Sequence, residues 1–436
     1  MGATILKHAN AMPAPTWHRL HMNDVDIELP AGLAADETGA EGGTAPGGVA
    51  IELAGAAAAG PDDAFDRALA ELQERLDAAR ALEPADARAV LRAAEGSADP
   101  GDLDVPALST CEARSVQEET ANQVAEAFAC GLGPEADAWI EQAAAEAADE
   151  DARAVVVCGA GQSSGVALRL AGADGNAMAA TLDLVAQPHS KISLSIEYDS
   201  PEGGAGVAAL KLRIFAGAGA RVAVEAIQTL DAGWIALDDS GYVLDEGARV
   251  EVTHRALGAK ASYTGLAADL RGDGSSIDID TRYVGHGANV VDFNYVVRHR
   301  GKKTSCDLNA NGVLLDESKK TLRGTIDLVH GCKGSEGTER DTVLLADERA
   351  QNKTVPVILC DEDDVAGNHG ATIGHVRPEQ LNYLQSRGLS PEAAEGLFAT
   401  AVLEEAAARA PSAAARAGVS RIASGLAVPF DADWEE

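Results

Sequence analysis

The chain has 436 residues, which is enough for two or three domains with a large hydrophobic core. It carries 69 acidic residues against 35 basic residues, so its formal net charge is -34 at pH 7. This charge repels phosphate backbones and anionic membrane surfaces, which disfavours nucleic-acid binding, and it favours solubility or contact with a basic partner.

Residues 1–152 predict a mixed N-terminal region with much helix. The segment DVDIELP, residues 24–30, alternates apolar and polar residues as a short strand does. From Pro61 to residue 82, apolar side chains recur at spacings of three and four, as on one face of a helix. Further helices are expected over residues 84–95, 115–129 and 135–149.

Short runs of alternating apolar residues fill residues 153–376 and predict a core made of strands. Each run offers one apolar face, because side chains two apart share a face of a strand. The runs are KISLSIEY (191–198), ALKLRIF (209–215), RVAVEAI (221–227), RVEVTH (249–254), SIDIDTRYV (276–284), GTIDLVHG (324–331) and VPVILCDED (355–363). A sandwich of this length would usually split in two, whereas a β-solenoid buries the faces by stacking one coil on the next. We therefore expect a mainly β fold with a solenoid core.

Three cysteines, Cys306, Cys332 and Cys360, recur at nearly equal intervals in this region. If the interval matches one coil, the three thiols stack in one column of the solenoid core. The alternative is three unrelated buried thiols, since free cysteine behaves as a small hydrophobic residue.

From residue 377 to 436 the pattern returns to helix. Four leucines fall on helical spacings, and RGLSPEAA has the composition of a helix end followed by a new helix start. These leucines are Leu381, Leu384, Leu397 and Leu403. We expect these leucines to bind a partner protein, because the solenoid cannot cover the C-terminal helices fully.

The segment VVVCGAGQSSG, residues 155–165, has the glycines of a dinucleotide-binding loop, and Asp183 follows at a suitable distance. Such a loop must open a helix whose amides hold a pyrophosphate, whereas the following VALRLAG is short and strand-like. The sequence also contains no GxxxxGK[ST] motif. We therefore expect that this chain binds no nucleotide.

Six cysteines are too few for a disulfide framework in a chain of this length, and the sequence contains no CxxC motif. The nearest pair with metal-ligand chemistry is His330 and Cys332, so no structural zinc site is expected. No run of eighteen apolar residues occurs, and the first residues lack the apolar core of a secretion signal. The sequence therefore predicts reduced thiols and a cytoplasmic protein that does not span a membrane.

An acidic cluster follows the last of the alternating runs and consists of Asp361, Glu362, Asp363 and Asp364. One interpretation is an acid/base or metal-binding set, as in β-helical enzymes that act on acidic polysaccharides. Alternation places Asp361 and Asp363 on one face and the other two on the opposite face. An enzyme for uronates also needs basic residues near the acids, and VILCDEDDVAGNHG has none. The second interpretation, a solvated strand end, is therefore favoured.

The segment DDVAGNHGATIG, residues 363–374, places His369 between Asn368 and Gly370. Glycine gives the backbone unusual freedom, so the sequence predicts a histidine displayed at a turn. Loops carry function disproportionately, which makes His369 a candidate site residue. The alternative is an ordinary exposed histidine.

The segment from residue 322 to residue 394 closely resembles the C-terminal signature of the SufB/SufD family. The similar motifs are, in order, Gly324–Ile326, LLADERA, DDV, HGATIG and YLQSRGL. Weaker similarity extends back to about residue 155, and PTWHRLHMND at residues 15–24 resembles a SufD-type start. Residues 61–150 match no part of the family pattern.

This resemblance implies a right-handed parallel β-helix flanked by N-terminal and C-terminal helical regions. It implies a non-catalytic scaffold in iron-sulfur cluster assembly, with a SufC-type ATPase docking on residues 377–436. It also implies a transient iron-sulfur cluster at a subunit interface. The second scaffold chain would be a SufB-type paralogue, or a second copy of this chain if it forms a homodimer. The cluster type, the sulfur donor and the binding of a reduced flavin stay open.

The motifs resemble SufD more than SufB. SufB-type chains carry a cysteine near residues 338–341, where this chain has TERD, and HEA where it has HGA. In SufD-type proteins the histidine of this motif is implicated in cluster assembly at the interface with SufB, so the resemblance assigns that role to His369. A neutral imidazole is a competent iron ligand and can also carry a proton. The family often has a cysteine at the position of Gly367, so the resemblance implies further ligands from a partner.

Overall fold

The computed structural model describes residues 4–14, 22–35, 48–82, 130–147, 150–375 and 377–426. The helices expected at 84–95 and 115–129 lie outside these residues. The chain divides into a main unit, residues 1–65 and 130–436, and a second unit, residues 66–129. Helix α1 (Ala64–Leu82) begins in the main unit and continues into the second, whereas α4 (Pro134–Glu146) belongs to the main unit. Both fall in ranges where helix is expected.

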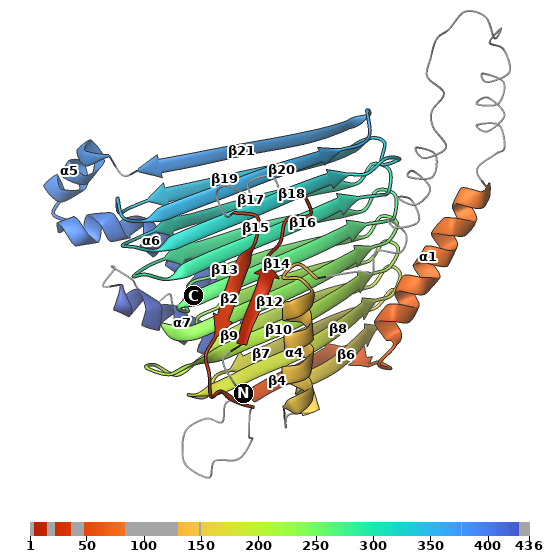
Figure 1. The fold of residues 1–436 in the computed structure, drawn as a ribbon, viewed down its shortest axis with the longest axis horizontal. Coiled ribbons are helices and arrows are strands. Elements are labelled where there is room, and N and C mark those ends of the chain that lie inside the picture. The colour runs from red at the N-terminus through yellow and green to blue at the C-terminus, as the bar shows by residue number, and fades with distance from the viewer. Residues whose placement is uncertain are drawn as a thin grey trace, which may run out of the picture. The chain divides into compact units, whose positions relative to one another are not determined.

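Two long sheets of parallel strands form the core of the main unit (Figure 1). One sheet, here called the even sheet, contains β6 (Arg153–Cys158), β8 (Asn176–Ala186), β10 (Ala205–Ala216), β12 (Gly233–Leu244), β14 (Ala261–Leu270), β16 (Val290–His299), β18 (Lys319–Leu328) and β20 (Gln351–Cys360). The odd sheet contains β7 (Ser163–Ala171), β9 (Lys191–Asp199), β11 (Arg221–Gln228), β13 (Arg249–Ala256), β15 (Ser276–Gly285), β17 (Ser305–Leu314), β19 (Ser335–Leu345) and β21 (Val365–His375). Each coil therefore supplies one strand to each sheet, and about eight coils form a parallel β-solenoid. The expected fold class is confirmed.

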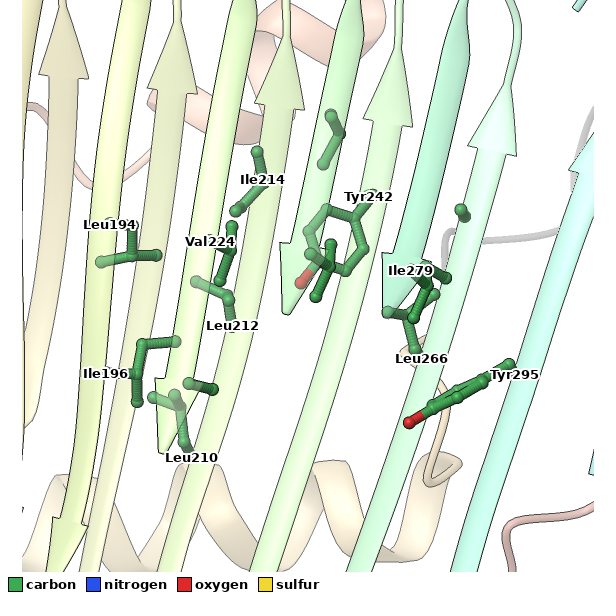
Figure 2. Packing of buried hydrophobic residues seen from close by; sticks show 14 of the residues in the cluster. Leu194, Ile196, Leu210, Leu212, Ile214, Val224, Tyr242, Leu266, Ile279 and Tyr295 are labelled. Atoms are coloured by element: carbon green, nitrogen blue, oxygen red, sulfur yellow. The ribbon is translucent and has the colours of Figure 1, made fainter. Parts of the chain in front are cut away.

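Alternating apolar side chains fill the space between the two sheets. In β9 the residues Ile192, Leu194 and Ile196 are buried, and the residues between them are exposed or half-buried. Stacked coils bring such side chains together, as Figure 2 shows for Leu194 and Ile196 beside Leu210 and Leu212. Because each coil covers the next, no second sheet pair is needed to bury these faces.

The outer face of the even sheet is covered by N-terminal elements. Strands β1 (Thr4–Ala9) and β2 (Val25–Leu29) form an antiparallel pair, which confirms the strand expected at residues 24–30. Together with α4 they pack apolar side chains on β8, β10 and β12. Consequently β12 is buried along almost its whole length, on both faces. A strand buried on both faces shows no alternation, which explains why the sequence pattern did not predict it.

Three helices follow the solenoid: α5 (Pro378–Ser386), α6 (Pro391–Ala408) and α7 (Ala413–Gly425). Side chains of α6 and α7 form one apolar cluster with Ile227, Leu257 and Val284 at the ends of the odd-sheet strands. Ion pairs support this docking, since Arg255 contacts Glu405 of α6 and Arg421 of α7 contacts Asp199. The last two helices are therefore part of the main unit's own core.

The two ends of the solenoid differ. At the first coil, β4 (Gly48–Gly55) pairs antiparallel with β7, and β5 (Ala57–Ala59) pairs antiparallel with β6. The short strand β3 (Ala34–Ala35) pairs with β8, and a 3-10 turn, Glu150–Ala152, leads into β6. At the last coil, no described strand continues either sheet beyond β20 or β21. The first end is thus capped, whereas no described strand caps the last end, which is here called the open end.

Two expectations from the sequence concern single segments. The glycine-rich stretch at residues 155–165 joins strand β6 to strand β7, so no helix follows it, as the composition of VALRLAG predicted. The predicted column of three cysteines is wrong, because the residues in register with Cys306 are Ile277 and Gly337. Cys332 lies in the turn before β19 and Cys360 ends β20 in the other sheet. In the described residues, no helix combines the length and apolar character needed to cross a bilayer.

Candidate functional site

The open end of the solenoid carries most of the residues that the sequence singled out. Strand β21 is exposed along almost its whole length, and its hydrogen-bonded neighbour among the described strands is β19 (Figure 1). Beneath it, β19 alternates over its first nine positions between buried residues and residues that are exposed or half-buried. The inner face of the last coil therefore lies at the mouth of the solenoid interior.

His369 lies in the middle of β21 and not at a turn, so the predicted turn is wrong. The glycines around it do not bend the chain, because parallel pairing with β19 holds the segment extended. The register places His369 directly beside Glu339, which is on the inward-facing set of β19. Aligned residues of neighbouring strands share a face, so His369 belongs to the inward set of the last coil, where it remains exposed.

Glu339 is buried, and its Oε2 has no hydrogen-bond partner among the described residues. Burial, together with the nearby charge of Asp341, raises the pKa of Glu339 to about 7, although Lys320 opposes the shift. The carboxyl group fits because residue 324 is glycine: a Cβ there would lie 2.6 Å from Cδ of Glu339. This gives a physical reason for the Gly324–Ile326 motif.

A buried ion pair lies next to Glu339. Lys320 Nζ donates to Asp341 Oδ2 at 2.5 Å, and both side chains are at most 1% exposed. Thr354 Oγ1 donates to the same carboxylate oxygen at 2.6 Å. Burial lowers the pKa of Lys320, although the negative charges of Asp341 and Glu339 act in the opposite direction. The open end therefore has a charged interior.

This arrangement can exchange protons near neutral pH. A carboxyl group with a pKa of about 7 is populated in both protonation states at that pH, and the imidazole of the next coil stands beside it in register. Glu339 can therefore take up and release a proton at the mouth of the interior. Such groups suit chemistry in which thiols or sulfide lose protons as they bind a metal.

The described residues give His369 no complete ligand set. It belongs to no group of three His, Cys, Asp or Glu side chains close enough to share a metal ion within the described chain. A cysteine at position 367 would also be crowded, since a Cβ on Gly367 would lie 2.9 Å from Cγ2 of Ile358. Any iron bound at His369 must therefore take its other ligands from outside these residues.

The acidic cluster lies in the connection between β20 and β21 rather than on a strand, so the expected two-faced alternation of residues 361–364 is wrong. Glu362 accepts hydrogen bonds from the backbone amides of Gly331 and Asp363, at 2.9 and 3.1 Å. These bonds lower the pKa of Glu362. Glu362 therefore provides hydrogen-bond acceptors for backbone amides in the turns of two neighbouring coils.

The three candidate thiols are in different surroundings. Cys332 is buried, and Cys306 is buried with its Sγ 3.3 Å from His299 Nε2. Burial raises the pKa of Cys306 to about 12 and lowers the pKa of His299 to about 4, so this pair is neutral near pH 7. Cys360 is exposed, so the prediction of a core thiol is wrong for this residue. It ends β20, where no further coil covers it.

The C-terminal leucines divide into two groups. Leu381 and Leu384 of α5 are half-buried, and Leu397 near the start of α6 is exposed. Leu403 is fully buried in the cluster that α6 and α7 form with the odd sheet, so its predicted role in partner binding is wrong. Its apolar side chain is used within the chain itself.

Sequence reasoning missed Glu339, Lys320 and Asp341. A signal for Lys320 exists, because alternation in KKTLRGTI places it on the same face as the buried Leu322 and Ile326. The same rule places Glu339 and Asp341 on the face of Val343. Charged residues at positions that the alternation assigns to the interior could therefore have indicated this site from the sequence.

Comparison with known proteins agrees with this picture. The family model described as "SUF system FeS cluster assembly, SufBD core domain" matches residues 169–402. The iron-sulfur cluster assembly protein SufD of Bacillus subtilis is 36% identical over 129 residues, which are 30% of each chain. SufB of the same organism is 25% identical over 163 residues, 37% of this chain and 35% of that protein. A SufBD family protein of Methanocaldococcus jannaschii is 30% identical over 118 residues, 27% of this chain and 36% of that protein.

These alignments span about a third of the length of the curated relatives, so they support the family more than the role of any one relative. The family model covers more than half of the chain, from β7 into α6, and includes both His369 and the buried charges beneath it. The chain therefore belongs to the SufBD family of the SUF system for iron-sulfur cluster assembly.

Proposed function

We propose that this chain is a SufD-like scaffold subunit that helps to assemble iron-sulfur clusters in the cytoplasm. In this proposal the open last coil pairs with a SufB-type chain, and a SufC-type ATPase binds near α5. The chain performs no catalysis of its own, and the transient cluster is the cargo of the assembled complex. Family membership disfavours the polysaccharide-active alternative.

One observation carries this proposal: His369 lies on an exposed end strand, directly in register with a buried Glu339. An uncovered edge strand presents unpaired amides and carbonyls that a second chain can use. The first coil has such a cover in β4 and β5, whereas the last coil has none among the described residues. A partner seated there would bring its ligands to His369.

The central test is anaerobic reconstitution of the co-expressed complex with iron and sulfide. His369→Ala should lower the charge-transfer absorption of the cluster severalfold, because it removes an iron ligand or proton carrier at the interface. It should leave folding and partner binding nearly unchanged, since an exposed side chain contributes little packing.

His375 is the matched control, because it is an exposed histidine at the end of the same strand. It follows His369 by six residues, which at the spacing of an extended strand places it roughly 20 Å away. His375→Ala should give the wild-type cluster yield. Equal yields from both variants and the wild type would contradict a role for His369.

The ATPase contact can be tested with the two groups of C-terminal leucines. Replacing Leu381, Leu384 and Leu397 together by alanine should weaken binding of a SufC-type ATPase at least tenfold, because these side chains are exposed or half-buried. Leu403→Ala should instead lower thermal stability, because Leu403 is fully buried against the odd sheet. Unchanged ATPase affinity in the triple variant would place the contact elsewhere.

The partner at the open end can be a SufB-type chain or a second copy of this chain. Native mass spectrometry of the protein expressed alone and with each candidate separates the two. A stable homodimer in the absence of any paralogue would favour the sole-scaffold version of the proposal. A monomer that becomes a heterodimer on mixing would favour the SufD-like version.

A further inference from the structure

A second group of metal-ligand side chains lies far from the open end, where α4 covers the even sheet. Cys130 precedes α4, Asp137 is in its first turn, and Asp239 is in β12. One ligand atom of each lies within 4.8 Å of the others. The group does not depend on the function proposed above, and it joins three segments that are distant in the sequence.

Each of the two carboxylates has one buried oxygen without a hydrogen-bond partner among the described residues. Asp239 is fully buried, and its Oδ1 accepts the amide of Leu132 at 2.7 Å. Its Oδ2 has no hydrogen-bond partner among the described residues, and neither has Oδ1 of Asp137. Burying a carboxylate oxygen without a donor is unfavourable. A bound cation or a shared proton would satisfy both oxygens.

The Cys130 thiol has a fixed position but makes only a weak hydrogen bond. Cys130 is buried, and its Sγ lies 3.8 Å from the carbonyl oxygen of Leu212, which is a weak contact. The next residue, Gly131, touches the backbone of β14 so closely that an added Cβ would lie 2.0 Å from the amide nitrogen of Leu266. Only glycine permits this approach, and it fixes the position of Cys130 above β12.

The surrounding charges match a divalent cation. Lys211 Nζ lies 3.2 Å from Asp137 Oδ2 and 2.8 Å from Glu141 Oε1. A thiolate, two carboxylates and Glu141 carry four negative charges, and Lys211 alone compensates one of them, so a divalent ion would neutralise two of the remaining three. Lys211 contacts Asp137 through Oδ2, which leaves Oδ1 of Asp137 without a hydrogen-bond partner among the described residues.

We propose that Cys130, Asp137 and Asp239 bind one divalent transition-metal ion of the zinc and iron(II) class. A thiolate with two carboxylates suits these metals, whereas magnesium and calcium prefer oxygen ligands alone. The bound ion fastens the start of α4 onto the even sheet, so its role is to stabilise the N-terminal cover of the solenoid.

Cobalt(II) is the probe, because a cobalt–thiolate bond produces a charge-transfer band in the near ultraviolet. The full chain is treated with a chelator, freed of iron and sulfide, and titrated with Co²⁺. We expect the band to saturate at one equivalent in the wild type and to disappear in Cys130→Ser. Cys158→Ser is the matched control, since Cys158 is a buried thiol whose Sγ contacts Ser164 instead of acidic groups. It should keep the band.

A stability measurement gives an independent readout. One equivalent of Zn²⁺ should raise the midpoint of thermal unfolding of the wild type by several degrees, because a ligand that binds only the folded state stabilises it. Asp137→Asn should lose most of this shift; Asp137 is only partly buried, so this variant should still fold. No saturable Co²⁺ band and no Zn²⁺ shift in the wild type would overturn the proposal and leave a shared proton between the two acids.

Discussion

The first and last coils of the solenoid are built from the same kind of strand but end in opposite ways. At the first coil, antiparallel strands β4 and β5 cover the edges, and the interior beneath them contains apolar residues such as Val156, Leu168 and Leu182. At the last coil the edges are bare in the described residues, and the interior contains Lys320, Glu339 and Asp341. The comparison shows that stacking buries the apolar faces of the middle coils, whereas an end coil has a neighbour on one side only and needs another element to cover its free edges. One end is covered by strands of the chain itself, whereas no described strand covers the other.

The largest effect should come from the buried ion pair at the open end. Lys320→Met removes the cation that compensates the buried carboxylate of Asp341, so it should lower the free energy of unfolding by about 3–5 kcal/mol. Arg340→Met is the control, because it breaks the exposed pair with Asp307 and should cost at most about 1 kcal/mol. Urea unfolding of both variants measures the difference. If both variants lost a similar free energy of unfolding, water would have to reach the interior of the last coils and solvate the charge of Asp341.

A matched pair of isoleucines compares covered and uncovered coils directly. Ile196 in β9 is fully buried between neighbouring coils (Figure 2), so Ile196→Ala should cost about 2–5 kcal/mol. Ile373 in β21 is 52% exposed, so Ile373→Ala should cost less than about 0.5 kcal/mol in the isolated chain. Denaturant unfolding tests both. If a partner covers the last coil, Ile373→Ala should weaken that association instead.

Glu339 should make stability depend on pH. Its pKa of about 7 in the folded chain is above the ordinary value of 4.5, so between these values the folded state binds more protons than the unfolded state. The stabilisation is present below about pH 4.5 and is lost as the pH rises through about 7. Glu339→Gln keeps a neutral side chain, so its stability relative to wild type should rise by roughly 1–3 kcal/mol from pH 5 to pH 8. Glu336→Gln, on the exposed face of the same strand, should show no such rise.

The smallest expected effect concerns the glycine that makes room for Glu339. Gly324→Ala places a Cβ 2.6 Å from Cδ of Glu339, so it should cost about 1 kcal/mol in the wild type. In a Glu339→Ala background the same substitution should cost less, and the double-mutant cycle measures the coupling. Gly370→Ala is a control with open space around the added methyl group. Equal costs in both backgrounds would show that the absence of a side chain at Gly324 is not needed to accommodate Glu339.

Much of the solenoid could be predicted because its strands are half-buried. Runs such as KISLSIEY alternate between the interior and the surface, and this pattern survives in the burial of β9. Strand β12 could not be found in this way, because β1, β2 and α4 cover its outer face and remove the alternation. The column of cysteines failed for a different reason: the register of Ile277, Cys306 and Gly337 gives 29 and 31 residues per coil, whereas the cysteines are only 26 and 28 residues apart.

The sequence by itself determined the fold class and the family motifs, and it singled out the segment around His369 as a candidate site, because alternation and short motifs are local properties of the chain. Only the tertiary structure decided what these residues face. The register of β21 on β19 puts His369 beside Glu339, and the burial of that carboxyl group raises its pKa to about 7. The covering helices decided that Leu403 is core while Leu397 is exposed. Burial and register depend on segments that are far apart in the sequence, and no local pattern carries that information.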